Sequence, residues 1–155
     1  MNIKHYLEEH HVPFEVMPHV KTFDALHLAE AVHVPGKEVA KTVLLRADHG
    51  FRYVVAILPS THRIDFSLLS ESLGGATVTL ASEQEIADRC PDCEVGALPP
   101  FGSCIGAETI VDTSLAEDEE IVFEGNTHHE AIRMKYQDFS NIEHPLQIQF
   151  GRQNK

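Results

Sequence analysis

The 155-residue chain has few basic residues for its size. Lysine and arginine together number 12 against 24 aspartates and glutamates, which gives a formal net charge of −12 at pH 7. Proteins that bind nucleic acid non-specifically are usually basic, because the neutralisation of phosphates supplies much of their affinity. The composition therefore argues against a tight, non-specific nucleic-acid binder, although it does not exclude a local contact with one RNA end.

The sequence also lacks the hydrophobic segments of membrane and secreted proteins. No run of about 18 apolar residues occurs, so we expect no transmembrane helix. The first residues, MNIKHYLEEHH, contain no apolar core of the kind found in signal peptides. We therefore expect a cytoplasmic protein that makes no membrane contact.

Cysteine is scarce, with only Cys90, Cys93 and Cys104 present. An odd number of cysteines in a reducing compartment does not predict a structural disulfide framework. The spacing of Cys90 and Cys93 would suit half of a zinc site or a redox pair, but no partner motif stands at zinc-finger spacing. We expect no bound metal, and we expect these two cysteines to lie at a helix end without a catalytic role.

Hydrophobic patterning predicts one α+β domain over residues 1–155, with no repeat or linker that divides it. Several neighbouring strands form hairpins, which favours a mixed, mainly antiparallel sheet with flanking helices over a doubly wound parallel sheet. Expected helix caps are Asn2, Thr22, Asp65 and a capping box of Ser82 with Glu85. The expected helices cover residues 2–10, 22–34, 65–73, 82–90 and 135–142, and the expected strands cover residues 12–17, 39–47, 51–58, 76–81, 109–112, 120–124 and 128–134.

One predicted strand carries a lysine on its apolar side, in the stretch GKEVAKTVLLRA at residues 36–47. Alternation places Lys41 on one face with Val39, Val43 and Leu45, and Thr42 on the other face. An unpaired ammonium is costly to bury. The lysine stem could pack on the strand while the amine reaches water. Alternatively, Lys41 lines a pocket and binds an anion or a polarised carbonyl oxygen.

A histidine pair follows a predicted two-residue turn at Gly125 and Asn126. In the strand expected after the turn, alternation places His128 on the more apolar face with Ile132 and places His129 on the solvated face. His128 is thus either an ordinary half-buried histidine with satisfied hydrogen bonds or a pocket residue near Lys41.

Residues 91–108 contain three prolines and three glycines and are expected to form a long, shaped loop. Loops of this length inside a compact domain are often functional. This one could present backbone N–H groups to a carbonyl or an oxyanion, or it could simply connect two elements. Its candidate substrate-binding residues are Gly96, Ala97, Pro99, Pro100 and Gly102.

The motifs of several common catalytic classes are missing. No serine lies in a G-x-S-x-G motif, and no H-E-x-x-H or paired-carboxylate pattern occurs. Neither a Walker loop nor a G-x-G-x-x-G segment is present. The candidate site therefore has no evident nucleophile or general base, and we expect no cofactor.

The order and spacing of these features resemble those of the YbaK family, also called the prolyl-tRNA synthetase-associated editing domain family. The similarity extends from about residue 25 to residue 139 and is carried by GKEVAKTVLLRA, AILPSTHRIDFSLLSESLGG, VGALPPFG and GNTHHEAIRMKYQDF. The resemblance implies one α+β domain with a curved, mainly antiparallel sheet and flanking helices. It also implies an enzyme that hydrolyses the ester joining a wrong amino acid to the end of a tRNA.

The resemblance further implies roles for individual residues. Lys41 matches the family's essential lysine, and the family's glycine–proline loop and glycine–histidine turn correspond to Gly96, Pro99, Pro100, Gly125 and His128. Because an aminoacyl ester is already activated, such a site needs mainly orientation of the substrate and stabilisation of an oxyanion or phosphate. No synthetase motifs accompany the family's segments. We therefore expect a freestanding trans-editing deacylase that acts on a mischarged tRNA, such as that for proline, with a synthetase as a second partner.

A hypothesis of a different class fits the same residues. The missing general base and the net charge of −12 also suit a non-enzymatic module of this fold that binds a nucleotide, an amino acid or a protein partner. A cysteine-dependent metal or redox protein is a third hypothesis, which the incomplete ligand spacing disfavours. None of the three involves DNA or a membrane.

Overall fold

The computed structural model describes residues 2–22, 24–48, 52–94 and 96–154. Its helices are α1 (Ile3–Glu9), α2 (Ala25–Val32), α3 (Phe66–Ser72), α4 (Glu83–Arg89), α5 (Thr113–Ala116) and α6 (Tyr136–Glu143), with 3-10 turns η1 (Gly36–Glu38) and η2 (Gly102–Ile105). Its strands are β1 (Glu15–Pro18), β2 (Ala40–Ala47), β3 (Arg52–Pro59), β4 (His62–Ile64), β5 (Val78–Leu80), β6 (Glu108–Asp112), β7 (Glu120–Glu124), β8 (Glu130–Lys135), β9 (Leu146–Ile148) and β10 (Gly151–Gln153).

The strands form three sheets. The largest has the order β5-β2-β3-β6-β9, in which β5, β2 and β3 are antiparallel neighbours and β6 and β9 run parallel to β3. A three-stranded antiparallel sheet has the order β1-β8-β7, and β10 pairs with β4. The predicted fold class, a mixed and mainly antiparallel α+β domain, is confirmed. None of the helices in the described ranges is long and apolar enough to cross a membrane.

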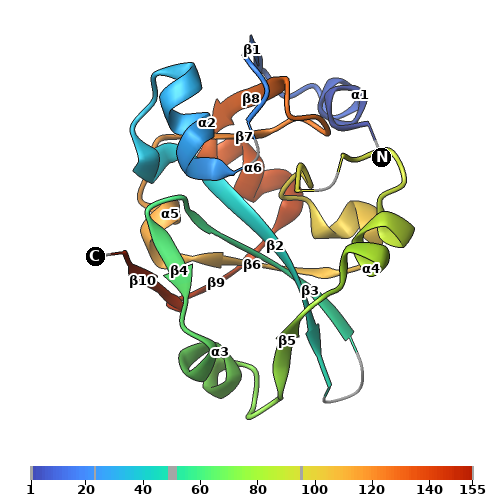
Figure 1. Ribbon diagram of the computed structural model, residues 1–155, viewed down its shortest axis with the longest axis vertical. Coiled ribbons are helices and arrows are strands. Elements are labelled where there is room, and N and C mark those ends of the chain that lie inside the picture. Colours follow the sequence, from blue (N-terminus) through green and yellow to red (C-terminus); the bar gives the residue numbers. More distant parts are fainter. Residues whose placement is uncertain (1, 23, 49–51, 95, 155) are drawn as a thin grey trace.

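Strands β2 and β3 separate two hydrophobic cores. Figure 1 shows this pair crossing the middle of the molecule, with α3 near one end and α1 and α2 near the other. Successive side chains of a strand point to opposite faces, so each strand contributes to both cores. The first core contains Leu44, Val55, Ile57, Phe101, Phe123 and Phe139, and the second contains Leu45, Val54, Leu58, Leu69 and Phe150.

Local capping follows the sequence closely, with one exception. Asn2 and Asp65 accept amide hydrogen bonds at the starts of α1 and α3, and the Ser82 capping box opens α4. The expectation that Thr22 caps the second helix is wrong. Asp24 is the N-cap of α2, because its carboxylate accepts a hydrogen bond from the amide of His27.

Two further expectations are wrong, one about a disulfide between cysteines and one about the turn at Gly125 and Asn126. Cys90 and Cys93 form a disulfide, whereas no structural disulfide was expected, and Cys104 is free. The connection between β7 and β8 is longer than a two-residue turn, because β8 begins only at Glu130. A backbone hydrogen bond of 2.9 Å from Gly125 N–H to Glu130 O closes this loop.

The C-terminal segment, which the sequence left unassigned, is held by a buried carboxylate. Asp112 Oδ1 accepts hydrogen bonds from the amides of Phe150 (2.8 Å) and Gly151 (2.6 Å), and Oδ2 accepts from Ser114. Burial opposes ionisation of Asp112, but the bonds from Ser114 and from the two amides outweigh it and hold the pKa of this carboxyl below its usual value.

We therefore predict that Asp112→Asn lowers the free energy of unfolding at pH 7 by about 1–3 kcal/mol, the usual cost of disturbing a buried charged hydrogen-bond acceptor. A carboxyl with a lowered native pKa stabilises the fold above its unfolded pKa of about 3.9, and this contribution is lost as the pH falls through the native value. Denaturant unfolding between pH 7 and pH 3 should thus show a shallower acid loss in the variant. Equal stability and equal acid loss would contradict this role, and Asp88→Asn on exposed α4 is the control.

Candidate active site

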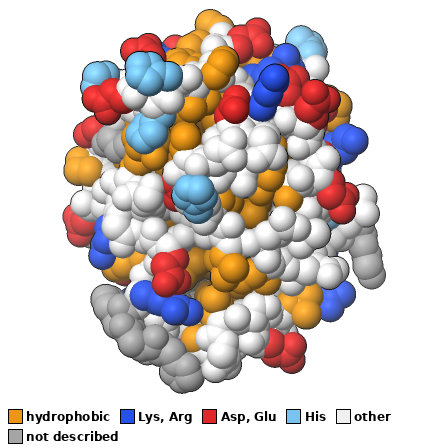
Figure 2. All heavy atoms as spheres, turned by 180° about the vertical axis from the view of Figure 1, so that it is seen from behind, with side chains coloured by type: hydrophobic (Ala, Val, Ile, Leu, Met, Phe, Trp, Pro, Cys, Tyr) orange, Lys and Arg blue, Asp and Glu red, His pale blue; other side chains and the backbone are white. Residues whose placement is uncertain are grey.

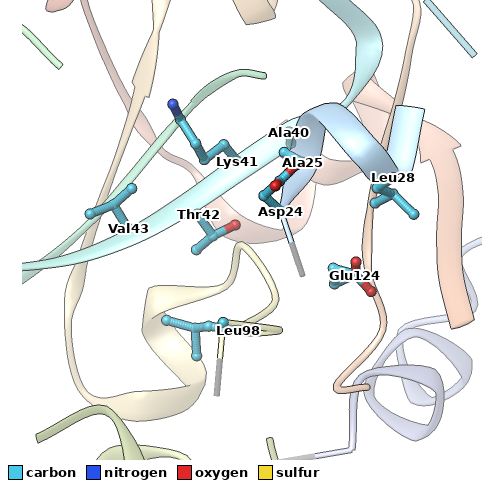
Figure 3. A pocket seen from close by; sticks show the side chains of 10 residues that line it. Asp24, Ala25, Leu28, Ala40, Lys41, Thr42, Val43, Leu98 and Glu124 are labelled. Atoms are coloured by element: carbon cyan, nitrogen blue, oxygen red, sulfur yellow. The ribbon is translucent and has the colours of Figure 1, made fainter. Parts of the chain in front are cut away.

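A pocket of about 260 Å³ lies beside the first half of β2. Strand β5 pairs with β2 only at Leu45–Ala47, so the start of β2 has no neighbour from β5. Helix α2, the loop near residues 96–98 and the end of β7 surround this part of the strand (Figure 3). The pocket is lined by Asp24, Ala25, Leu28, Ala40, Lys41, Thr42, Val43, Gly96, Leu98 and Glu124.

Lys41 and Thr42 leave β2 in opposite directions, as alternation predicts. Figure 3 shows Thr42 on the same side of the strand as Leu98 and Glu124, with Lys41 on the other side. Lys41 therefore borders the pocket from the strand's rear face, and its ammonium extends toward β4.

The apolar row around Lys41 suggested an unpaired ammonium, but the structure gives this ammonium a partner. Its Nζ donates a 2.6 Å hydrogen bond to the backbone oxygen of His62. Partial burial removes water from the amine and lowers the pKa of Lys41 below its usual value. An ammonium has three donors, so two N–H groups remain for a substrate oxygen when His62 takes one.

Glu124 supplies the pocket with a buried carboxyl that the sequence analysis missed. Its side chain is only 11% exposed, and Thr22 donates to Oε1 over a long 3.4 Å. Ring nitrogens of His19 and His128 lie 3.7 Å and 3.9 Å from the carboxylate oxygens. Burial, reinforced by the nearby charge of Glu94, raises the pKa of Glu124 to about 8.

The glycine–proline loop lines the pocket with two residues rather than with the five that were expected. Gly96 and Leu98 line the pocket, and their N–H groups donate to no group among the described residues. The amides of Ala97 and Gly102 already donate to Glu94 O and to Thr109 Oγ1. Pro99 and Pro100 are buried, have no N–H group and do not line the pocket.

Gly102 has a packing role at the far end of this loop. A Cβ atom at this position would come within 2.4 Å of Thr109 Oγ1 and 2.9 Å of Ala107 O, which are shorter than van der Waals contacts. The hydroxyl of Thr109 also donates to Glu143, whose carboxylate accepts from Ser103 as well. Gly102 therefore lets the loop pack closely against β6 and lies outside the pocket lining.

His128 is buried and His129 is exposed, although strand alternation is not the reason. Both residues lie in the loop before β8. The His128 amide donates to the Glu94 carboxylate at 3.4 Å, and its ring stands beside Glu124. Gly125, the first residue of the loop, is packed against Ile132. The structure thus connects His128 and Gly125 to the pocket through Glu124 and does not place either in its lining.

A signal for Glu124 was present in the sequence. In the segment EIVFE, alternation places Glu124 on the same face as Val122, which is fully buried. A carboxylate that shares a face with a buried valine is a candidate for burial itself. His19 gave no comparable signal, because it lies beyond β1 in an irregular segment whose backbone is tied to the loop of His128 and His129.

Several arginine side chains of the described residues are paired with carboxylates. Arg46, Arg52, Arg133 and Arg152 form ion pairs with Glu85, Glu108, Glu15 and Asp65. On the face shown in Figure 2, acidic, basic and histidine side chains are scattered and the basic ones form no continuous surface. No group of three His, Cys, Asp or Glu side chains in the described ranges is arranged to hold a metal ion.

Comparison with known proteins gives a consistent family. A family model for the aminoacyl-tRNA editing domain matches residues 18–142. The multifunctional Ser/Thr-tRNA deacylase ProXp-y of Escherichia coli (strain K12) is 31% identical over 102 residues, which cover 65% of this chain and 60% of that protein. The match thus spans less than two thirds of the relative's length.

Solved structures share the fold over nearly the whole chain. Hypothetical protein APE2540 has a TM-score of 0.86 at 15% identity and covers 98% of this chain and 100% of its own. A candidate trans-editing enzyme for prolyl tRNA synthetase has a TM-score of 0.82 at 16% identity and covers 97% of this chain and 95% of its own. Identities this low show a common fold and carry no statement about substrate.

Burial of Glu124 predicts a specific pH dependence of stability. Since its native pKa of about 8 exceeds the ordinary value of 4.5, the native state holds a proton that the unfolded chain has lost between these values. The free energy of unfolding should fall as the pH rises from 4.5 through 8. Glu124→Gln removes this loss, so we expect the variant to gain at least about 1 kcal/mol on wild type between pH 4.5 and pH 8.5.

Denaturant unfolding at the two pH values measures the effect. Glu120→Gln, the same substitution at the other end of β7, is the control and should follow wild type. A Glu124→Gln variant whose stability changes with pH in parallel with wild type would show that the carboxyl is ionised in the native state.

Proposed function

This chain belongs to the aminoacyl-tRNA editing domain family, and we propose that it hydrolyses the ester bond of a mischarged aminoacyl-tRNA in the pocket beside β2. The observation that carries the proposal is the position of Lys41. The resemblance matches this residue to the family's essential lysine, and its stem forms part of the wall of a pocket of about 260 Å³. The tRNA acceptor end would lie across the open side of the pocket.

For this reaction the protein has mainly to position the ester and a water molecule and to stabilise the negative charge that develops. Water adds to the ester carbonyl carbon, negative charge develops on the carbonyl oxygen, and the ribose oxygen leaves with a proton. The ammonium of Lys41 and the amides of Gly96 and Leu98 are donors that can stabilise the developing charge or hold a terminal phosphate. Holding the ester and water together in the pocket supplies the rest of the rate enhancement.

The size of the pocket favours a small amino acid. A volume of about 260 Å³ is less than that of typical pockets for drug-sized ligands. The Escherichia coli relative is named for seryl and threonyl tRNA, and a structural neighbour is described for prolyl tRNA synthetase. We therefore expect serine, threonine or alanine esters as substrates, with tRNA for proline among the tRNAs to be tested and a synthetase as a second partner.

Acidic composition limits how tightly the chain alone can hold tRNA. Most arginines are paired with carboxylates, and the net charge is −12. Recognition would then depend on the aminoacyl end, or on a synthetase that delivers the tRNA in the cytoplasm. A binding module without catalysis is the second candidate, and a deacylation assay over a panel of mischarged tRNAs separates the two.

We predict that Lys41→Met reduces kcat/KM for deacylation by about 10²–10³, the usual effect of removing one contact that stabilises charge in a transition state. Methionine keeps most of the stem's packing and removes only the charge. Because the ammonium is partly desolvated, its loss should leave the free energy of unfolding within about 1 kcal/mol of wild type. Lys135→Met, an exposed lysine at the start of α6, is the control for charge alone.

Full activity of Lys41→Met on every mischarged tRNA tried would show that the lysine has only a structural role. The deacylase assignment would then lose its main residue-level support.

The histidine pair gives a second, internally controlled prediction. His128→Ala opens space beside Glu124 and frees the neighbouring loop, so we expect at least a tenfold loss of kcat/KM or a changed amino-acid preference. His129→Ala removes an exposed side chain and should change kcat/KM less than twofold. Steady-state kinetics of the two variants measure the contrast. The opposite ranking would place His129, and not His128, on the functional side of the loop.

A further inference from the structure

Two residues that line the candidate pocket each carry a buried oxygen atom that has no hydrogen-bond partner among the described residues. The two atoms are Thr42 Oγ1, on β2, and Glu124 Oε2, at the end of β7. Buried polar atoms are nearly always hydrogen-bonded, because leaving one unpaired costs free energy. Two such atoms in the wall of one pocket indicate that a polar ligand completes their bonding.

Glu124 is the carboxylate available to such a ligand. Asp24 also lines the pocket, but its two oxygens already accept hydrogen bonds from the amide and the ring of His27, at 2.8 Å and 2.7 Å. Glu124 has only the 3.4 Å contact from Thr22, and no lysine or arginine among the described residues lies within 4.0 Å of it. Its nearest charged or titratable neighbours are His19, His128 and Glu94.

We infer that Glu124 binds the α-ammonium group of the aminoacyl ester. This inference rests on the proposed function and names the part of the substrate that the pocket recognises. A free α-ammonium is common to all aminoacyl-tRNAs and is the one cation at the reacting end. Side chains of the described residues offer no metal site, so an organic cation is the partner that the carboxylate fits.

The arrangement gives the ammonium and the ester separate partners. The ammonium would meet Glu124 on the Thr42 side of β2, and the ester carbonyl oxygen would meet the amides of Gly96 and Leu98 on the same side. Burial holds Glu124 largely neutral in the empty pocket at pH 7, and an incoming cation favours its ionised form. The carboxylate thus becomes charged when its partner arrives.

This geometry defines a substrate class. Aminoacyl-tRNAs with a free α-amine are accepted, whereas peptidyl-tRNA and N-formylated or N-acetylated aminoacyl-tRNAs, whose α-nitrogen is uncharged, are rejected. The rule applies to whichever small side chain the pocket admits.

Binding of a stable substrate mimic tests the inference independently of catalysis. The probe is 3′-deoxy-3′-(L-seryl)aminoadenosine, in which an amide replaces the ester, and its partner is the same molecule with a hydroxyl in place of the α-ammonium. The two have nearly the same size, so a difference in Kd measured by calorimetry at pH 7 reports the charge. Wild type should bind the ammonium form about 10–100-fold more tightly, the range for a hydrogen bond between charged groups.

Substitutions assign that preference to one residue. Glu124→Gln should weaken binding of the ammonium form and bring the two Kd values within about threefold, with the hydroxyl form little changed. Glu124→Asp, which keeps the charge on a shorter stem, should retain part of the preference, and Glu120→Gln should retain all of it. Circular dichroism and thermal melting verify that each variant is folded.

Equal binding of the two forms by wild type, an undiminished preference in folded Glu124→Gln, or no binding of either form would overturn the inference. Charge-selective binding by a wild-type protein that hydrolyses no aminoacyl-tRNA would support it and contradict the proposed function. The two failures are therefore distinguishable.

Discussion

Eight antiparallel residue pairs join β2 to β3, and their register decides which side chains reach the pocket. Lys41 pairs with Leu58 and Thr42 with Ile57, so the two neighbours point into different surroundings. A slip of one residue would exchange the faces of both. The burial of Leu44 in one core and Leu45 in the other makes such a slip costly, because it would turn both core faces over. The fold thus places an amine and a hydroxyl on opposite sides of one strand.

The pocket retains polar groups at the expense of stability. A carboxyl buried with its pKa raised to about 8 and a threonine hydroxyl that finds no partner in the described part of the chain both disfavour the folded state relative to apolar replacements. By contrast, Asp112 and Glu143 are buried carboxylates whose oxygens accept several hydrogen bonds each. The same residue type therefore serves two purposes here. Asp112 and Glu143 hold chain segments together, whereas Glu124, with one oxygen unsatisfied among the described residues, lines a cavity where a ligand can complete its bonding.

The sequence predicted the fold class, most helix caps and the two faces of β2, because short-range periodicity and side chain–backbone hydrogen bonds determine them. It did not predict the buried state of Glu124, which depends on α2 and the segment near His19 folding over the end of β7. His128 is buried as the sequence predicted, but strand alternation is not the cause. The backbone leaves strand geometry at Gly125 and re-enters it at Glu130, so His128 lies in a loop. The loop prolines were expected to bind substrate, but they do not line the pocket, whereas Gly96 and Leu98 of the same loop do. Contacts between distant segments determine these features, and local patterns do not record them.

We propose that the aminoacyl end of tRNA occupies the pocket between α2, β2 and the loop near residues 96–98. Backbone amide chemical shifts recorded while the seryl-aminoadenosine mimic is titrated test it most directly. We expect the largest changes at Thr42, Leu98 and Glu124, with little change in α3. Changes concentrated instead at the cavity bordered by Ser103, Glu143 and Leu146, on the β6–β9 side of the molecule, would contradict it.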